Sequence, residues 1–462
     1  MTTTTVPAPA PEQQALAAQN VHPRRTRFVV IGWVYSILGV LLMELSGRVP
    51  SDDITFTFGI PPDVPQITLD PPGMVLLAGM VLLAGGITGI FEHRLGNITR
   101  VGLAVATAAF VPLLLVLSLA YSTSSKQTNL IPILVESLRQ GTPIALGALA
   151  GLWCERSGVV NIGIEGMMLA AAGGGFVAYA VLGGAEGGFW LWASVLIAVL
   201  IGGLMALLHA VLCVTFRTDQ IISGVVINLL ALGVTSYLRQ QVIVPSGEGG
   251  GGITLPTWNI PLLSDIPIIG PVFSGKPIYF AMFALVALTT WVLFRTPFGL
   301  RVRSVGENPH AAETLGVDPI RIRYLAVVIG GLIAGLGGAW FSLETVGSFE
   351  DNMTNGTGFI ALAALIFGKW RPWQSFGGAM LFGFAAALGT RLQILSVRLE
   401  DFRLLDLSRF GLDVSVVRIT GLEIPSQALQ ALPFAVTIVV LAGAIGRAIA
   451  PAADGVPFER SK

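Results

Sequence analysis

The chain has 462 residues, of which 53% are apolar and 12% are charged, and its formal net charge is zero. Soluble domains carry about 25% charged residues, so this composition excludes a chain that folds mainly in water. A neutral chain has no strongly basic surface, and no nucleic-acid partner is expected. Its two cysteines, Cys154 and Cys213, lie beside or inside apolar segments and predict neither a disulfide framework nor a metal site.

Long uncharged apolar runs recur from residue 28 onward. A helix needs about 20 such residues to cross a membrane, and in lipid it satisfies its own backbone polar groups. The runs are continuous rather than alternating, which excludes a β-barrel. The sequence predicts an all-α integral membrane protein, a polytopic helical bundle of about 10 to 12 transmembrane segments with a broken helix and a helical hairpin. Spans are predicted near 28–46, 73–91, 101–121, 130–153, 159–182, 189–215, 220–240, 278–295, 323–345 and 429–449.

Positive charge sets the predicted orientation. If the amino terminus is cytoplasmic, most Lys and Arg residues fall in cytoplasmic segments, as the positive-inside rule requires. The segments 47–72 and 241–277 are rich in Gly and Pro and poor in positive charge, and are predicted to lie outside. We therefore expect a multi-pass protein of the plasma membrane, surrounded by lipid, with both termini cytoplasmic.

A polar break interrupts the apolar sequence between 141 and 166. Its polar residues are Glu155, Arg156, Asn161 and Glu165. Ionisable groups at membrane depth mark a cavity, a break or a buried pair, and glycines such as Gly163 permit unwound backbone there. The segment predicts a broken helix that faces the interior. The alternative is a cytoplasmic ion pair between the first two residues, with the other two capping the next helix.

A short helix is predicted within the cytoplasmic loop 295–323. Asn308 is a good N-cap, Pro309 fits the first turn, and Gly316 can end the helix. Such a helix suits docking into a partner's groove, although a plain linker helix is the alternative. A second feature, the segment 358–391, has a first arm too short to cross alone. It predicts a helical hairpin with Trp370 and Trp373 at the cytoplasmic interface.

Three motifs in the same order give a family resemblance. ERSGVVNIGIEGMM at 155–168, FRTPFGLRVRSVGENPHAAETLGVD at 294–318 and GFIALAALIFGKWRPW at 358–373 resemble permeases of binding-protein-dependent ABC importers for simple sugars and nucleosides, in the nucleoside branch. The resemblance covers about residues 130–390. Together with the composition and the predicted spans, it divides the chain into a disordered cytoplasmic tail (1–27), amino-terminal transmembrane helices (28–129), a permease core (130–450) with a coupling loop (295–323) and an extracytoplasmic insertion (391–428), and a cytoplasmic tail (451–462).

The resemblance also implies partners and site residues. It implies a second permease subunit, identical or related, an extracytoplasmic substrate-binding protein and a cytoplasmic ABC ATPase. It places the cavity-facing break on Asn161, Gly163 and Glu165. Three polar residues within or beside apolar segments complete the translocation-path candidates: Glu155, Arg156 and Asn228. The ATPase-coupling candidates are Glu307, Asn308, Pro309, His310, Ala311, Ala312, Leu315, Gly316 and Val317. Asn228 has a second reading, in which it bonds a neighbouring membrane helix.

No cofactor is expected on this chain. A phosphate-binding loop needs G-x-x-x-x-G-K-[ST], and Pro277 follows the Gly275–Lys276 pair where the hydroxyl should be. ATP and Mg are therefore expected on the partner ATPase, and the chain is predicted not to be an enzyme. An ion-coupled secondary transporter of a polar solute is the first alternative, and an ABC permease for a simple sugar is the second. An intramembrane enzyme is disfavoured because the four histidines show no catalytic spacing.

Overall fold

The computed structural model divides the chain into two compact units, which are described separately. Unit 1 contains residues 1–130 and 390–429, and unit 2 contains 131–389 and 430–462. The residues described are 22–59, 65–122, 125–182, 188–246, 254–395, 398–399, 402–406, 415–419, 422–423, 431 and 448–460.

Three long helices form the bulk of unit 1. Its helices are α2 (His22–Ser46), α3 (Pro71–Ile90), α4 (Glu92–Leu95) and α5 (Asn97–Ala120). Glycines let them pack closely, because a Cβ on Gly32 of α2 would lie 2.6 Å from the Gly86 carbonyl oxygen of α3. The spans predicted near 28–46, 73–91 and 101–121 are confirmed. The first helix begins at His22, inside the segment 1–27 that was predicted to be a disordered tail.

Short strands occupy two segments of unit 1 that were predicted as loops. β1 (Ile54–Thr57) pairs antiparallel with β2 (Gln66–Leu69), Ile54 opposite Leu69, and parallel with β3 (Gln127–Asn129). In the insertion 391–428, β6 (Arg398–Leu399) pairs with β9 (Leu422–Glu423), and β7 (Phe402–Asp406) pairs with β8 (Ser415–Ile419). The β-branched residues of ITFT and QITL favour the extended backbone of β1 and β2.

Unit 2 is built mainly from long helices, the first and last of which extend a few residues past its boundaries in the chain. They are α6 (Leu130–Glu155), α7 (Ile164–Leu182), α8 (Phe189–Ala210), α9 (Gln220–Leu238), α11 (Pro277–Arg295), α14 (Pro319–Ala339) and α16 (Pro372–Leu395). The shorter helices are α10 (Val244–Ser246), α12 (Pro297–Glu307), α13 (Pro309–Thr314), α15 (Thr357–Phe367) and a 3₁₀ turn at Gly270–Phe273. α8, α9 and α14 continue into π-helical turns at Val211–Thr215, Arg239–Ile243 and Trp340–Val346. β4 (Trp258–Asn259) pairs with β5 (Ser274–Gly275).

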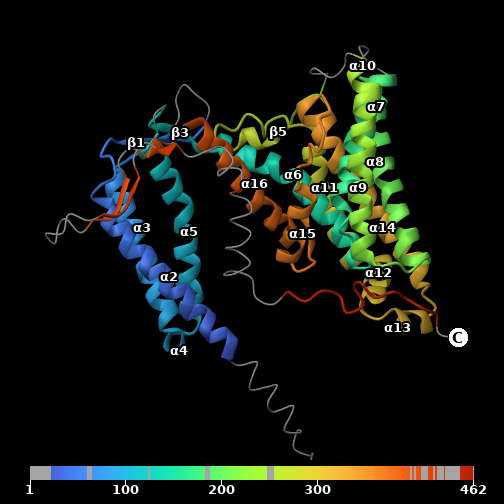
Figure 1. Ribbon diagram of the computed structural model, residues 1–462, viewed down its shortest axis with the longest axis horizontal. Coiled ribbons are helices and arrows are strands. Elements are labelled where there is room, and N and C mark those ends of the chain that lie inside the picture. The colour runs from blue at the N-terminus through green and yellow to red at the C-terminus, as the bar shows by residue number, and fades with distance from the viewer. Residues whose placement is uncertain are drawn as a thin grey trace, which may run out of the picture. The chain divides into compact units, whose positions relative to one another are not determined.

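α14 lies in the core of unit 2, packed against α7 and α8 (Figure 1). Its small residues permit this: a Cβ on Gly331 would lie 2.6 Å from the Gly202 carbonyl oxygen of α8, and a Cβ on Gly338 would lie 2.2 Å from the Met168 carbonyl oxygen of α7. The glycine pattern of α14 therefore fixes helix packing.

Eight helices in the described part of the chain are long and apolar enough to cross a membrane. The predicted all-α polytopic fold is confirmed, and so is the hairpin, as α15 and α16. α6 and α16 are not among the eight, although the 26 residues of α6 cover the predicted span at 130–153. The span predicted near 429–449 lies almost entirely outside the described residues.

Candidate functional site

The polar break between α6 and α7 holds the turn of the α15–α16 hairpin. After α6 ends at Glu155, Gly158 adopts a φ of +88°, and α7 starts at Ile164. The Trp370 indole donates to Glu155 Oε2 at 2.5 Å, and the Trp370 carbonyl accepts from Arg156 Nε and Nη2 at 3.0 and 2.7 Å. Both charged side chains therefore bind the hairpin turn, a contact that the sequence did not predict.

Asn161 is fully buried among sulfur atoms. Its Nδ2 donates to Cys154 Sγ at 3.3 Å and to Met167 Sδ at 3.5 Å. Its Oδ1 has no hydrogen-bond partner among the described residues. The adjacent Gly163 allows close contact with α9, because a Cβ on Gly224 would lie 2.8 Å from the Gly163 nitrogen. The unwound backbone here serves close packing of α9 on the start of α7.

Glu165 anchors the start of α15. Its Oε1 accepts from Thr354 Oγ1 at 2.6 Å and from the Gly356 N–H at 2.8 Å, and its Oε2 accepts from the Gly358 N–H at 2.5 Å. The first N–H groups of a helix have no acceptor within the helix, and a carboxylate at this end accepts hydrogen bonds from them. Its negative charge also interacts favourably with the positive end of the helix dipole. This buried side chain caps α15, a helix almost 200 residues later, rather than its own helix.

Asn228 ties α9 to the start of α7. Its Oδ1 accepts from the Gly166 N–H at 2.7 Å, and its Nδ2 donates to the Ile162 carbonyl at 3.1 Å. The structure thus matches the second reading of Asn228, a bond to a neighbouring helix. Hydrogen bonds of the candidate path residues connect the polar break and α7 to α9 and to the α15–α16 hairpin. None of these candidates lines the open cavity described next.

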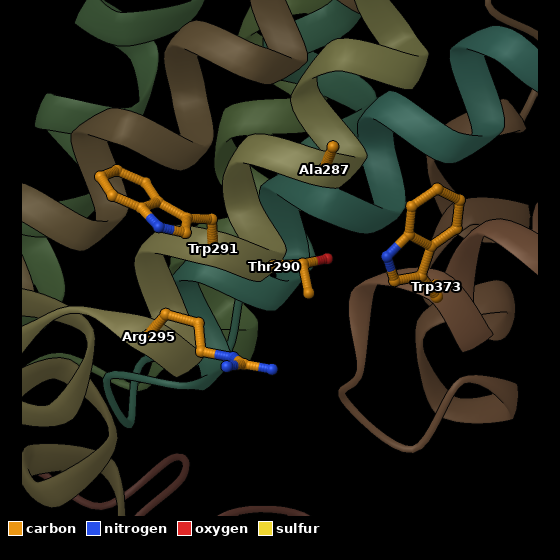
Figure 2. A pocket seen from close by; sticks show the side chains of 5 residues that line it. All are labelled: Ala287, Thr290, Trp291, Arg295 and Trp373. Atoms are coloured by element: carbon orange, nitrogen blue, oxygen red, sulfur yellow. The ribbon is translucent and has the colours of Figure 1, made fainter.

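An open cavity of about 570 Å³ lies against α11 and the start of α16. Figure 2 shows Trp291 and Trp373 on opposite sides of the view, with Thr290 between them, Ala287 above and Arg295 below. Both indoles are more than half exposed. Two aromatic rings, a hydroxyl and a guanidinium suit a planar polar ring system, which can stack and hydrogen-bond. The sequence offered one signal, since residues 287, 290, 291 and 295 share a helix face.

The predicted coupling helix is present as α13. Asn308 accepts from the Ala311 N–H at 3.0 Å, Pro309 occupies the first turn, and Gly316 has a φ of +81° after the helix end. Pro309 and Ala312 face inward, whereas Leu315 is 85% exposed. The exposed members of the coupling set are Glu307, Asn308, His310, Ala311, Leu315 and Gly316, and Val317 is half-buried.

One contact connects this loop to the polar break. Glu307 Oε1 lies 4.0 Å from Arg156 Nη1, and Phe294 lies under two guanidinium groups, 5.7 Å from Arg156 Cζ and 5.0 Å from Arg303 Cζ. Burial lowers the pKa of Arg156, and the neighbouring Glu307 opposes that shift. The coupling candidates and the first two path candidates therefore meet at one end of unit 2.

Sequence reasoning missed a contact of the carboxy-terminal segment at the same end. The Ala453 N–H donates to the Gly306 carbonyl at 2.9 Å, and the Ala452 N–H donates to Glu307 Oε2 at 3.3 Å. Burial raises the pKa of Asp454 to about 7, and nearby Arg323 opposes that shift. The segment has no periodic pattern that could have predicted a docked position.

Residues 133–405 match the family described as branched-chain amino acid transport system / permease component. The chain belongs to this permease family. The permease is 39% identical over 332 residues to the guanosine ABC transporter permease NupQ of Bacillus subtilis, covering 71% of this chain and 97% of that protein. It is 39% identical over 334 residues to the nucleoside ABC transporter permease NupC of Lactococcus lactis, with the same two shares. A putative glucose ABC transporter permease of Haloferax volcanii is 39% identical over 270 residues, covering 58% of this permease and 80% of that protein. No solved structure matches the permease.

These matches confirm the resemblance found in the sequence. The permease is the membrane-spanning transport component of an ABC importer and not an enzyme, as predicted. The ion-coupled alternative is therefore set aside. Permeases of this family work in general with an ATPase and a substrate-binding protein.

Proposed function

We propose that this permease imports a nucleoside delivered by an extracytoplasmic substrate-binding protein. The proposal depends on the share of each relative's length that aligns with this permease. That share is 97% for the guanosine and nucleoside permeases and 80% for the glucose permease. A simple sugar is the second candidate, because that third relative has the same identity over the part that aligns.

We further propose that α13 contacts a cytoplasmic ABC ATPase, which holds the ATP and Mg, and that a second permease subunit, identical or related, completes the path. Support comes from the exposed Leu315 and from the basic residues gathered at this end of unit 2, including Arg156 and Arg303. Positive charge favours the cytoplasmic side. On this basis we assign the carboxy-terminal segment to the cytoplasm of a plasma-membrane protein. The amino terminus is assigned to the same side from the sequence, because Arg24, Arg25 and Arg27 precede the first span.

Uptake in vesicles tests the substrate. Membrane vesicles containing the permease, its ATPase and its binding protein are expected to accumulate radiolabelled nucleosides when ATP is supplied. Pentoses and hexoses serve as competitors and as alternative substrates. Import of a hexose or pentose without import of any nucleoside would overturn the nucleoside assignment and support the sugar candidate.

We place a nucleobase contact in the cavity between Trp291 and Trp373. Stacking of a base on an aromatic side chain contributes about 1–3 kcal/mol, so Trp373→Ala is expected to reduce nucleoside uptake about tenfold. Trp33→Ala is the matched control, because Trp33 is an exposed tryptophan on α2 of unit 1. If Trp373→Ala lowers only the amount of folded protein, with uptake per folded molecule unchanged, Trp373 is an interfacial anchor and the contact is wrong.

Reversing the charge of Glu307 tests the coupling role. Glu307→Lys places a positive charge beside Arg156 and removes the acceptor for the Ala452 N–H. ATP hydrolysed per imported nucleoside is expected to rise about fivefold or more, the lower range of typical coupling between sites. Glu350→Lys, on an exposed carboxylate after α14, is the control. An unchanged ratio in Glu307→Lys would contradict the assignment of α13.

A further inference from the structure

The carboxy-terminal strap, residues 448–460, packs along α12 and α13 at the end of unit 2 (Figure 1). It forms neither a helix nor a sheet strand, yet Ala453 and Phe458 are buried. Its attachment to α12 is through backbone, by the Ala453 N–H bond to Gly306 described above. A loop segment that buries side chains and pairs its backbone with a helix end is part of the folded core rather than a free tail.

A buried arginine joins the strap to the polar break. Arg323, near the start of α14, is 1% exposed. Its Nε donates to the Ser157 carbonyl at 3.2 Å, and its Nη1 donates to the Val456 carbonyl of the strap at 2.9 Å. A buried charge is tolerated only when it is hydrogen-bonded or paired. The strap therefore supplies one of the acceptors that keep Arg323 inside the protein, next to the turn after α6.

The backbone geometry of that turn fits the strap. Gly158 has a φ of +88°, and a Cβ there would lie 2.9 Å from the Ala453 carbonyl oxygen and 2.9 Å from Arg323 Nη2. A side chain at this position would therefore push the strap away. The close approach links the strap directly to the residues that follow Glu155 and Arg156.

Phe458 and Arg460, near the carboxy-terminal end of the strap, contact residues of α13. The Phe458 ring lies 5.1 Å from the His310 ring, centroid to centroid, and is 5% exposed. Arg460 Nε lies 3.8 Å from Glu313 Oε1, and its Nη2 lies 3.2 Å from Asp318 Oδ2. Aromatic contact and opposite charges thus hold both ends of the coupling helix.

Beside these contacts, the direct ion pair from the coupling loop to the break is weak. The Arg156–Glu307 pair is 4.0 Å long, and Glu307 is more than half exposed. Exposed ion pairs contribute about 0–1 kcal/mol. The strap contacts are more numerous, and three of the residues that make them, Phe458, Ala453 and Arg323, are buried, whereas Arg460 is 60% exposed. A displacement of α13 therefore reaches the 155–158 turn chiefly through the buried strap contacts.

We propose that the carboxy-terminal strap positions the coupling helix on the polar break, so that movement of α13 by the ATPase is passed to Arg156 and Trp370 and hence to the hairpin. This inference rests on the proposed function of α13. Phe458 and Arg460 are positioning residues in this scheme, because they act through α13 and not on the solute.

The double variant Phe458→Ala/Arg460→Ala tests the strap. It removes the grip on α13 and leaves the Arg323 and Ala453 contacts in place, so the protein is expected to fold. ATP hydrolysed per solute imported is expected to rise about fivefold or more. The conservative variant Phe458→Tyr/Arg460→Lys keeps the ring and the charge, and is expected to retain the wild-type ratio.

Hydrogen exchange in the detergent-solubilised chain checks docking without any transport assay. The Ala453 amide is expected to be protected in wild type and in the double variant, with protection near Phe458 lost only in the latter. A proportional loss of uptake and ATP hydrolysis, or an unchanged ratio, would overturn the strap proposal. Absence of nucleoside uptake by the wild-type protein would instead contradict the proposed substrate. The ratio of ATP hydrolysed to solute imported would then be measured with the sugar that is imported.

Discussion

Replacing Glu165 with alanine is expected to abolish nucleoside uptake and to lower the free energy of unfolding by about 3 kcal/mol. The carboxylate accepts hydrogen bonds from Thr354 Oγ1 and from the Gly356 and Gly358 N–H groups. Each buried donor that loses its acceptor costs about 1–3 kcal/mol. Because two of the three donors are backbone groups at the start of α15, no rotation of a side chain can satisfy them.

The variant Glu165→Gln tests whether the negative charge is needed, because glutamine removes the charge and keeps one oxygen that can accept a hydrogen bond. An amide keeps one acceptor oxygen but turns a donor toward backbone N–H groups, so we expect this variant also to lose stability, though less than alanine. Glu350→Gln, an exposed carboxylate on the same loop between α14 and α15, serves as the control. Thermal unfolding of the purified protein in detergent measures the effect, and uptake per folded molecule measures the hairpin's role. Wild-type melting of Glu165→Ala would show that these bonds do not hold α15.

The membrane helices and α13 could be predicted because their signals are local. Apolar runs define the spans, and the Asn308 cap with Gly316 defines α13 to within a residue. The hairpin followed from an arm too short to span the membrane. The side-chain contacts of the hairpin turn had no local signal: Trp370 is 6% exposed and donates to Glu155, whereas Trp373 is 53% exposed.

The remaining features depend on partners far away in sequence. Glu165 was expected to face a path or to cap its own helix, and only folding shows that it caps α15. The buried Arg323 and Val456 of the strap lie 133 residues apart, and no local pattern pairs them. Nor does the sequence indicate that Glu155 and Arg156 share one tryptophan, since the contact spans more than 200 residues. Long-range contacts of this kind determine the geometry of the site and could not be predicted, whereas local signals in the sequence predict where the helices lie.

Replacing Gly331 with alanine is expected to lower the free energy of unfolding by about 3 kcal/mol, although helix propensity alone favours alanine by about 1 kcal/mol. The added methyl would lie 2.1 Å from Ala206 Cβ and 2.6 Å from the Gly202 carbonyl oxygen. The second contact is with backbone, so α8 and α14 must separate along their length. Loss of that packing removes the close contact between α8 and α14 in the core of unit 2.

Gly233 provides a matched control for the packing argument. It is also a glycine within a membrane helix, but a Cβ there meets nothing within 4 Å. Gly233→Ala is therefore expected to leave the melting temperature unchanged or to raise it slightly, following propensity. The yield of monodisperse protein and the melting temperature in detergent compare the two variants. If the two variants have the same melting temperature, the close approach of α8 and α14 does not limit stability. Helix propensity, and not packing, then decides the sign of the Gly331→Ala effect.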